Sequence, residues 1–286
     1  MDFDTRVTSY RNMYGNFLRD AKKVRLLTEF PGNIGDRLIF EGTKRLLDLE
    51  EIRHRELSLA DFVASNADFS KEVLLIPGSG ALTEIYNEWL PEVVMNAASR
   101  FERVVILASE YEPNVPKVSQ ALGRSNVFAF ARDAESFAKI RGFGRAGIAL
   151  DPALWAFDWL EPAAISPELN MSEGTLVALR TDRLSLLSAS GLRLGVMNRD
   201  ISTESASLDE FLLAISGCRQ VVTDRLHVLV ASIMLGKQVH YADPREEKIS
   251  RYVRFTLRDH LSAQVHYRGL EWLASQEFIE RDEREV

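Results

Sequence analysis

The sequence predicts an α/β protein with two doubly wound, Rossmann-like domains that face a cleft. Short β-rich runs alternate with segments of helical period through most of the 286 residues. Runs such as residues 73–76 and 104–108 are almost continuously apolar, which is typical of parallel strands buried on both faces. The alternation stops at residues 161–174, which contain two prolines and no clear period, and then starts again. We therefore expect domains at residues 1–162 and 173–286.

The first domain is predicted to contain five strands with amphipathic helices between them. The period of the apolar residues separates the two kinds of segment. The predicted strands are residues 24–29, 73–77, 104–109, 127–132 and 147–151. The predicted helices are residues 36–49, 88–100, 115–123 and 133–142.

The second domain repeats the alternation and is expected to end in a helical tail, from residue 248 towards residue 280. Its predicted strands are residues 175–179, 192–197, 220–223 and 238–242. Its predicted helices are residues 208–216 and 225–235.

Composition excludes several classes of protein. With a net charge of −7, the chain lacks the basic surface that general nucleic-acid binding requires, so an anionic substrate needs a local cluster of arginines. Cys218 is the only cysteine, so an intrachain disulfide is excluded. Its position just before an apolar run indicates a buried structural residue. The first residues are acidic, and no apolar stretch approaches the ~20 residues of a membrane span. We therefore expect a cytoplasmic protein without a signal peptide.

The most informative segment is residues 221–236, which predicts a strand, a tight turn and the start of a helix. Arg225 and His227 follow Thr-Asp in that turn. Ligands of open α/β sheets bind beyond the carboxyl ends of the strands. An arginine and a histidine at this point indicate an anionic substrate and an acid–base step, although a lone histidine is usually a bystander. Lys248 follows the next predicted strand and is a further candidate.

A second candidate site is the loop at residues 32–36, between the first predicted strand and helix. Its glycines allow a tight turn, and the helix that follows exposes unpaired N–H groups to a ligand. Asn33, Gly35 and Asp36 are therefore candidate binding residues. Alternatively, Asp36 only caps its helix. The spacing is not that of the dinucleotide-binding fingerprint.

A third candidate is Gly78-Ser79-Gly80, directly after a buried type of strand. This loop either holds a ligand against its backbone amides or is an ordinary glycine-rich connection.

Two arginines at predicted strand ends are also candidates for recognition of carboxylate or phosphate. Arg132 precedes Asp133, a predicted helix cap, and Arg180 lies two residues before Asp182. For each arginine, a structural ion pair is the alternative.

No metal site is expected. The remaining histidines are dispersed along the chain, and no H-E-x-x-H sequence or Cys/His cluster is present. A G-x-S-x-G elbow and a Walker sequence are also absent from the chain.

Taken together, these motifs resemble the polysaccharide pyruvyl transferase family. The resemblance rests on the ordered set Gly32-Asn-Ile-Gly-Asp36, Ala131-Arg-Asp-Ala-Glu-Ser136, Asp151-Pro152, Thr223-Asp-Arg-Leu-His227 and the segment 243–248. Two departures stand out. Val228 occupies a position where the family often has glycine, and the family's longer glycine run is reduced here to Pro77-Gly-Ser-Gly80.

The resemblance implies a GT-B-like fold and the transfer of pyruvate from phosphoenolpyruvate to a sugar as a ketal, with release of phosphate. The first domain then binds the acceptor and contributes Arg132, and the second binds the donor substrate. Arg132, Arg225 and Lys248 are the expected cations around phosphoenolpyruvate. His227 is the expected general acid, and Asp36 and Asp182 are candidate bases. No cofactor is expected.

The expected acceptor is a sugar of an exopolysaccharide or capsule repeat unit. If that acceptor is lipid-linked, we expect transient association with the inner face of the membrane. Two alternatives remain at this point: a GT-B glycosyltransferase that uses a nucleotide sugar, and a non-catalytic relative that binds sugar or phosphate.

Overall fold

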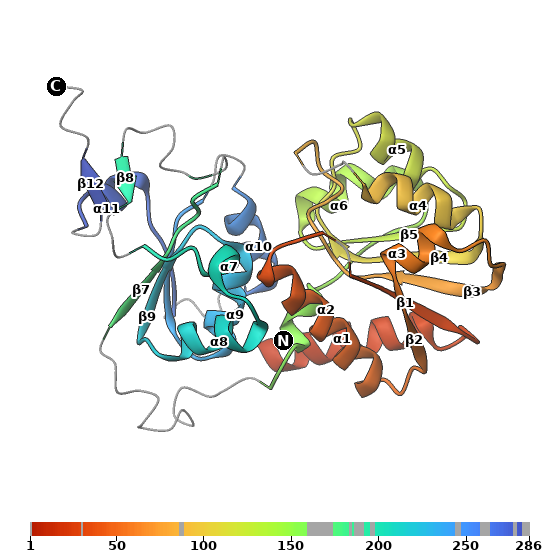
Figure 1. Ribbon diagram of the computed structural model, residues 1–286, viewed down its shortest axis with the longest axis horizontal. Coiled ribbons are helices and arrows are strands. Elements are labelled where there is room, and N and C mark those ends of the chain that lie inside the picture. Colours follow the sequence, from red (N-terminus) through yellow and green to blue (C-terminus); the bar gives the residue numbers. More distant parts are fainter. Residues whose placement is uncertain are drawn as a thin grey trace. The chain divides into compact units, whose positions relative to one another are not determined.

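The computed structural model shows two compact units, each with its own sheet (Figure 1). The first unit is Met1–Gly32 with Ile39–Phe157, and the second is Asn33–Leu38 with Asp158–Val286. The structure describes residues 2–29, 31–85, 89–158, 174–182, 185, 192–194, 198–243, 247–257, 264–276 and 279–281. Most of the predicted linker at residues 161–174 lies outside this part of the chain.

The sheet of the first unit has six strands in the order β2-β1-β3-β4-β5-β6, and all neighbouring pairs are parallel. Its strands are β1 (Val24–Thr28), β2 (His54–Ser58), β3 (Phe69–Ile76), β4 (Phe101–Ser109), β5 (Val127–Ala131) and β6 (Ala146–Ile148). The predicted parallel sheet is confirmed, because the apolar runs are strands that neighbours and helices cover completely.

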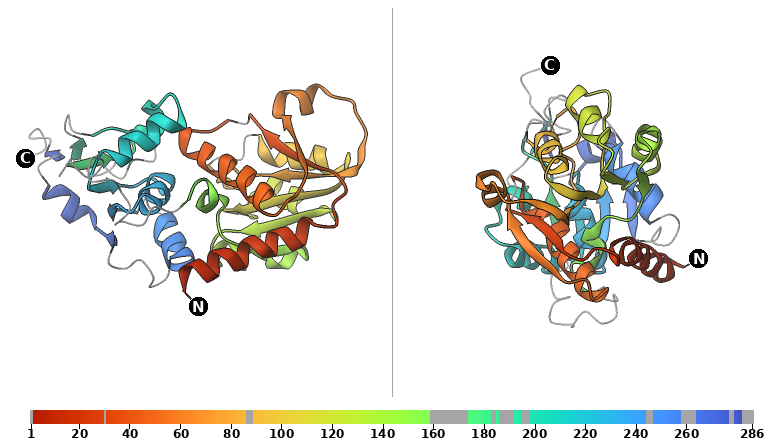
Figure 2. Two further views of the ribbon diagram at one scale, coloured as in Figure 1. Left: turned by 90° about the horizontal axis from the view of Figure 1, so that it is seen from below. Right: turned by 90° about the vertical axis from the view of Figure 1, so that its right-hand side faces the viewer.

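Helices cover both faces of this sheet. On one face, Leu74 and Ile76 of β3 pack with apolar residues of the helices α3, α4 and α5. On the other face, the ring of Phe17 in α1 lies edge-on to Phe128 and Phe130 of β5, at centroid distances of 5.1 and 5.2 Å. Figure 1 shows α4 and α5 on the side of the strands opposite to α1, and α1 runs along the sheet in Figure 2, left. The first unit is therefore doubly wound.

The described residues of the first half contain six helices, of which the second, fourth, fifth and sixth begin and end within two residues of the prediction, and the first and third were not predicted. They are α1 (Phe3–Leu18), α2 (Ile34–Leu49), α3 (Leu59–Ala64), α4 (Leu90–Ala98), α5 (Pro116–Leu122) and α6 (Ala134–Ile140), with short 3₁₀ turns at Arg141–Phe143 and Pro152–Trp155. The first turn of α2 belongs to the second unit and the remainder to the first. At Gly42, an added Cβ would lie 1.9 Å from the carbonyl oxygen of Pro152, so glycine is required where α2 approaches that turn.

The second unit contains a four-stranded parallel sheet in the order β11-β10-β9-β7. Its strands are β7 (Thr175–Ala178), β9 (Gln220–Thr223), β10 (Gln238–Tyr241) and β11 (Val265–Tyr267). Its helices are α7 (Ile201–Glu204), α8 (Leu208–Ser216), α9 (Leu226–Met234), α10 (Lys248–Thr256) and α11 (Leu270–Ala274). A separate antiparallel pair joins β8 (Leu192–Leu194) to β12 (Ile279–Arg281). The coarse prediction of two Rossmann-like α/β parts is confirmed.

The tail differs from the prediction of a continuous helix. Within it, β11 adds a parallel edge strand to β10. The pairing places His266 beside His240, with rings stacked at 5.2 Å, and Tyr267 beside Tyr241. Aromatic cross-strand pairs of this kind stabilise a strand, and they outweigh the local helical pattern of the tail.

Cys218, just before β9, is buried, and its Sγ lies 3.1 Å from the carbonyl oxygen of Ile215. Burial raises the pKa of its thiol. A structural role, as predicted, fits this environment. Among the described residues, no helix is both long and apolar enough to cross a membrane.

Candidate functional site

The turn between β9 and α9 is fixed by its own hydrogen bonds and by a buried helix. The hydroxyl of Thr223 donates to the carbonyl oxygen of Ala178 (2.9 Å) and accepts from the backbone N–H of Arg225 (3.0 Å). Every residue of α9 except His227 is buried. Val228, the departure from the family pattern, is part of this buried helix. Arg225 and His227 are therefore held at the carboxyl end of the sheet.

Arg225 is the centre of a network of charges. Its Nε donates to Asp200 Oδ1 (2.6 Å), and its Nη2 donates to Asp200 Oδ2, which completes a two-pronged ion pair. The same Nη2 lies 3.2 Å from Asp182 Oδ2. Arg225 and Asp200 are 5% and 1% exposed, so the pair is desolvated and strong.

Asp182 connects this buried pair to the surface. Its carboxylate accepts from Arg180 Nε (3.0 Å) and Nη2 (2.9 Å) as well as from Arg225. Because its side chain is 38% exposed, the network opens to solvent at this residue. The structure therefore brings together three of the predicted site residues from the ends of two neighbouring strands.

Asp200 is a further candidate residue, which the sequence did not suggest, because it pairs with Arg225. It precedes α7, and its Oδ2 also accepts from the backbone N–H of Thr181 (3.0 Å). Its backbone N–H donates to Glu204 (2.8 Å). The only signal in the sequence is an aspartate shortly after the apolar run that ends at residue 197.

His227 lies beside the first turn of α2, within the second unit. Its Nδ1 is 4.0 Å from Asp36 Oδ1. The other oxygen of Asp36 accepts from the backbone N–H of Asn33 (2.9 Å), and Asn33 Oδ1 accepts from the N–H of Gly35 (2.9 Å). This reciprocal pattern is a capping box. Capping and a role at the site are therefore compatible, because Asp36 caps with one oxygen and faces His227 with the other.

Gly35 is required where α2 meets His227. An added Cβ would lie 2.8 Å from the Cβ of His227 and 3.0 Å from Asn33 Oδ1. Real Cβ atoms do not approach side chains this closely without displacing them. The glycine in this loop therefore allows Asp36 and the imidazole to lie close together.

Lys248 is the first residue of α10, which follows β10. Asp243 caps this helix, since its two oxygens accept from the N–H groups of Ile249 and Ser250 at 2.8 Å each. Neighbouring parallel strands end at the same edge of a sheet, so Asp243, shortly after β10, lies on the edge where Arg225 lies.

The remaining predicted residues belong to the first unit, after β3 and β5. Gly78 packs against the backbone of β4, because an added Cβ would lie 2.2 Å from the carbonyl oxygen of Ala108. Ser79 donates its N–H to Ser109 Oγ (3.0 Å), and its own Oγ accepts from Ala81 N–H (2.9 Å). In the Gly78-Ser79-Gly80 loop, the amides of Ser79 and Ala81 are thus already bonded within the protein.

Arg132 is also buried in the first unit. Its Nη2 donates to Glu110 Oε2 (2.7 Å), and the two side chains are 2% and 3% exposed. The neighbouring Asp133 caps α6 as predicted, accepting from the N–H of Ser136 at 2.8 Å. Of the two alternatives for Arg132, the structural ion pair is the one present. A role in substrate binding stays a prediction.

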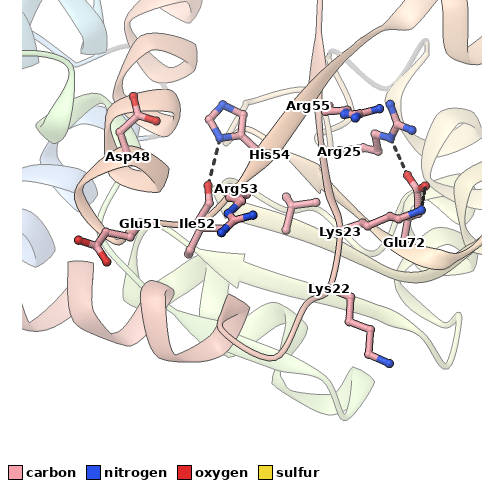
Figure 3. Close-up of a pocket in the computed structure, with 11 residues that line it drawn as sticks. Lys22, Lys23, Arg25, Asp48, Glu51, Ile52, Arg53, His54, Arg55 and Glu72 are labelled. Atoms are coloured by element: carbon pink, nitrogen blue, oxygen red, sulfur yellow. Dashed lines mark hydrogen bonds and ion pairs between the residues drawn. The ribbon is translucent and has the colours of Figure 1, made fainter.

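A cavity of about 690 Å³ lies at the opposite ends of the strands, beside the first residues of β1 and β2. Figure 3 shows the basic side chains around it, with Arg25 and Lys23 directed to Glu72. Because ligands of parallel sheets bind beyond the carboxyl ends, we do not assign the anionic substrate to this cavity.

The fold and the charge network define an α/β protein with an arginine- and histidine-containing site at the ends of a parallel sheet. A family model, polysaccharide pyruvyl transferase, matches residues 33–243. The chain therefore belongs to the polysaccharide pyruvyl transferase family, as the motifs predicted. Among curated proteins, none matches the sequence significantly.

Solved structures support the fold. A functionally uncharacterised protein from Klebsiella pneumoniae subsp. pneumoniae has a crystal structure that is similar to this chain, with a TM-score of 0.70. The two sequences are 19% identical, and the alignment covers 91% of this chain and 98% of that one. At this identity the likeness concerns the fold alone.

Proposed function

We propose that this pyruvyl transferase takes its pyruvyl group from phosphoenolpyruvate and transfers it to a sugar of an exopolysaccharide or capsule repeat unit. The observation that carries the proposal is the β9–α9 turn, where Arg225 lies in an ion network and His227 lies next to Asp36. The GT-B-like arrangement implied by the resemblance, with the acceptor on the first unit, is part of the same proposal.

Phosphoenolpyruvate is a small trianion, so its site needs several cations. Arg225 and Arg180 supply guanidinium groups, whose planar forks match both carboxylate and phosphate. Asp182, half-exposed between them, occupies the position that an anion entering from solvent would take over. Lys248 supplies a point charge from the next strand end. Arg132 remains a predicted contact, conditional on its release from Glu110.

His227 is proposed to protonate the methylene carbon of phosphoenolpyruvate. The new C–H bond leaves an oxocarbenium-like centre at the carbon that carries the phosphate. A sugar hydroxyl attacks this centre, the C–O bond to phosphate breaks, and a second hydroxyl closes the ketal. The two hydroxyl protons balance the reaction, one replacing the proton lost by His227 and one leaving with phosphate. General acid–base help of this kind contributes about 10²–10⁴-fold in rate.

Asp36 supports this role electrostatically. A helix N-terminus disfavours a charged imidazole, and His227 lies in the first turn of α9. A carboxylate near Nδ1 favours the imidazolium form, and the bound trianion adds to this effect. In this proposal Asp36 orients the imidazole, so that Nε2 delivers the proton. Asp182 is left as the candidate that accepts a hydroxyl proton.

The test is to incubate the protein with phosphoenolpyruvate and candidate pyranose acceptors in D₂O and follow release of phosphate. We expect phosphate release to depend on the acceptor, and the methyl group of the new ketal to carry one deuterium. Thermal stabilisation by phosphoenolpyruvate, but not by nucleotide sugars, separates this proposal from a glycosyltransferase. Stabilisation by phosphoenolpyruvate without turnover on any acceptor would favour a non-catalytic relative. Stabilisation by nucleotide sugars alone would overturn the proposal.

If the acceptor is lipid-linked, the protein is expected to associate transiently with membranes that contain it. Co-sedimentation with vesicles that carry the acceptor, compared with vesicles without it, tests this point.

A further inference from the structure

The side chain of Asp224 is the most unusual polar group at this site. It directly follows β9, precedes Arg225 and is 2% exposed. Its Oδ1 accepts from the backbone N–H of Arg180 (2.7 Å). Its Oδ2 is fully buried and has no hydrogen-bond partner among the described residues. An ionised oxygen without a donor is costly to bury, so these surroundings favour the neutral acid.

Three charged groups, from three different segments, act on Asp224. Arg180 lies after β7, Asp200 before α7, and Arg225 at the start of α9. The pKa of Asp224 is raised to about 6, mainly by burial and in small part by Asp200, although the N–H of Arg180 and the two guanidinium groups act to lower it. The carboxyl group therefore changes its charge near pH 6.

The two arginines already have carboxylate partners. Arg225 is paired with Asp200 and Arg180 with Asp182. Among the described residues of this network, an ionised Asp224 is therefore the excess negative charge. A trianion that binds at Arg225 meets this charge inside a buried region, where like charges repel strongly.

On the basis of the proposed function, we propose that Asp224 takes up a proton when phosphoenolpyruvate binds, and so couples affinity for the donor substrate to pH. Protonation removes the repulsive charge and turns Oδ2 from an acceptor without a partner into a possible hydrogen-bond donor. Asp224 is then a positioning residue, because it acts through the Arg225 network and takes no part in bond making.

The experiment is calorimetric titration of phosphoenolpyruvate into the full chain between pH 6 and pH 8, in buffers with different enthalpies of ionisation. The variants are Asp224→Asn and, as a matched control, Asp182→Asn. The first keeps the acceptor for Arg180 N–H and mimics the protonated acid. The second removes one carboxylate of the same network and leaves Asp224 in place.

We expect the wild-type protein to take up more protons on binding than Asp224→Asn, by up to one. Above the pKa of Asp224, its Kd should rise relative to that variant by up to about tenfold per pH unit. The ligand's own titration cancels in this comparison. Asp182→Asn should keep the wild-type dependence on pH.

Equal proton uptake by the wild-type protein and Asp224→Asn would overturn the inference and leave the proposed function intact. An equal loss of pH dependence in both variants would also overturn it, because the net charge of the network, and not Asp224, would then be responsible. If the wild-type protein binds no phosphoenolpyruvate at any pH, the proposed function itself is wrong.

Discussion

Arg132 and Arg225 invite comparison, because each follows a parallel strand, in a different unit, and each pairs with a buried carboxylate. Arg132 and Glu110 are both almost completely buried, and their ion pair is closed. Arg225 and Asp200 are also buried, but the network continues through Asp182, which is 38% exposed. Arg132 therefore lies in an ion pair that solvent does not reach. Arg225 is connected to solvent through Asp182, which an anion could replace.

The difference shows that an arginine at a strand end is not by itself evidence of a ligand site. A buried ion pair must be separated before its arginine can bind an anion, and leaving a buried charge without its partner costs several kcal/mol. In the Arg225 network, an anion can replace Asp182 while Asp200 remains paired. For this reason we propose that the anion binds in the second unit.

The largest expected effects come from breaking each buried pair. Asp200→Ala and Glu110→Ala should each lower the free energy of unfolding by about 3–5 kcal/mol, because each leaves a buried guanidinium without its carboxylate. Denaturant unfolding measures this loss. Phosphoenolpyruvate should restore part of it in Asp200→Ala, where the ligand replaces the missing carboxylate. Comparable rescue of Glu110→Ala would show instead that Arg132 binds the donor substrate.

The second-largest expected effect is that of Asp224 on the pH dependence of the free energy of unfolding. Its folded-state pKa of about 6 lies above its ordinary value of 3.8. The folded state therefore binds the proton more tightly, and this stabilisation is complete below the ordinary value and lost as pH rises through 6. Relative to Asp224→Asn, the wild-type protein should lose about 3 kcal/mol between pH 3 and pH 8. Parallel pH profiles for the two proteins would contradict the assignment.

Gly35 gives the smallest effect and tests the contact between α2 and His227. Gly35→Ala should destabilise the protein by about 1–3 kcal/mol, because its methyl group meets the side chain of His227. Turnover should fall as well, since the imidazole moves. Gly142→Ala is the matched control, because an added Cβ there meets no atom within 4 Å. Equal behaviour of the two variants would exclude the close approach at Gly35.

The central strands could be predicted from the sequence because both their faces are buried, so their apolar runs are continuous. Of the edge strands, β6 and β7 were also predicted, whereas β2 and β11 were not. β2 contains His, Arg and Glu, and Leu57 is its only buried residue, so it has no apolar run. The short strand β11 lies in a segment whose apolar residues have a helical period. It is a strand because its backbone pairs with β10.

At the candidate site, the positions of Arg225, His227 and Arg180 at strand ends could be predicted, because a short apolar run followed by polar residues is a local sequence pattern. The carboxylate partners of Arg225 and His227 were harder to predict. Asp200 meets Arg225 across 25 residues of sequence, and no local pattern marks that pairing. Asp36 was read as a cap or a base, and its approach to His227 depends on the first turn of α2 joining the second unit.

The most direct test of the account compares kcat and phosphoenolpyruvate affinity in the wild-type protein, His227→Ala and Arg225→Lys. We predict that His227→Ala loses about 10²–10⁴-fold in kcat and keeps its Kd for phosphoenolpyruvate, because it removes the general acid alone. Arg225→Lys should weaken binding, because an ammonium group cannot reproduce the two-pronged contact. Near-normal turnover of His227→Ala, or unchanged binding by Arg225→Lys, would contradict the account.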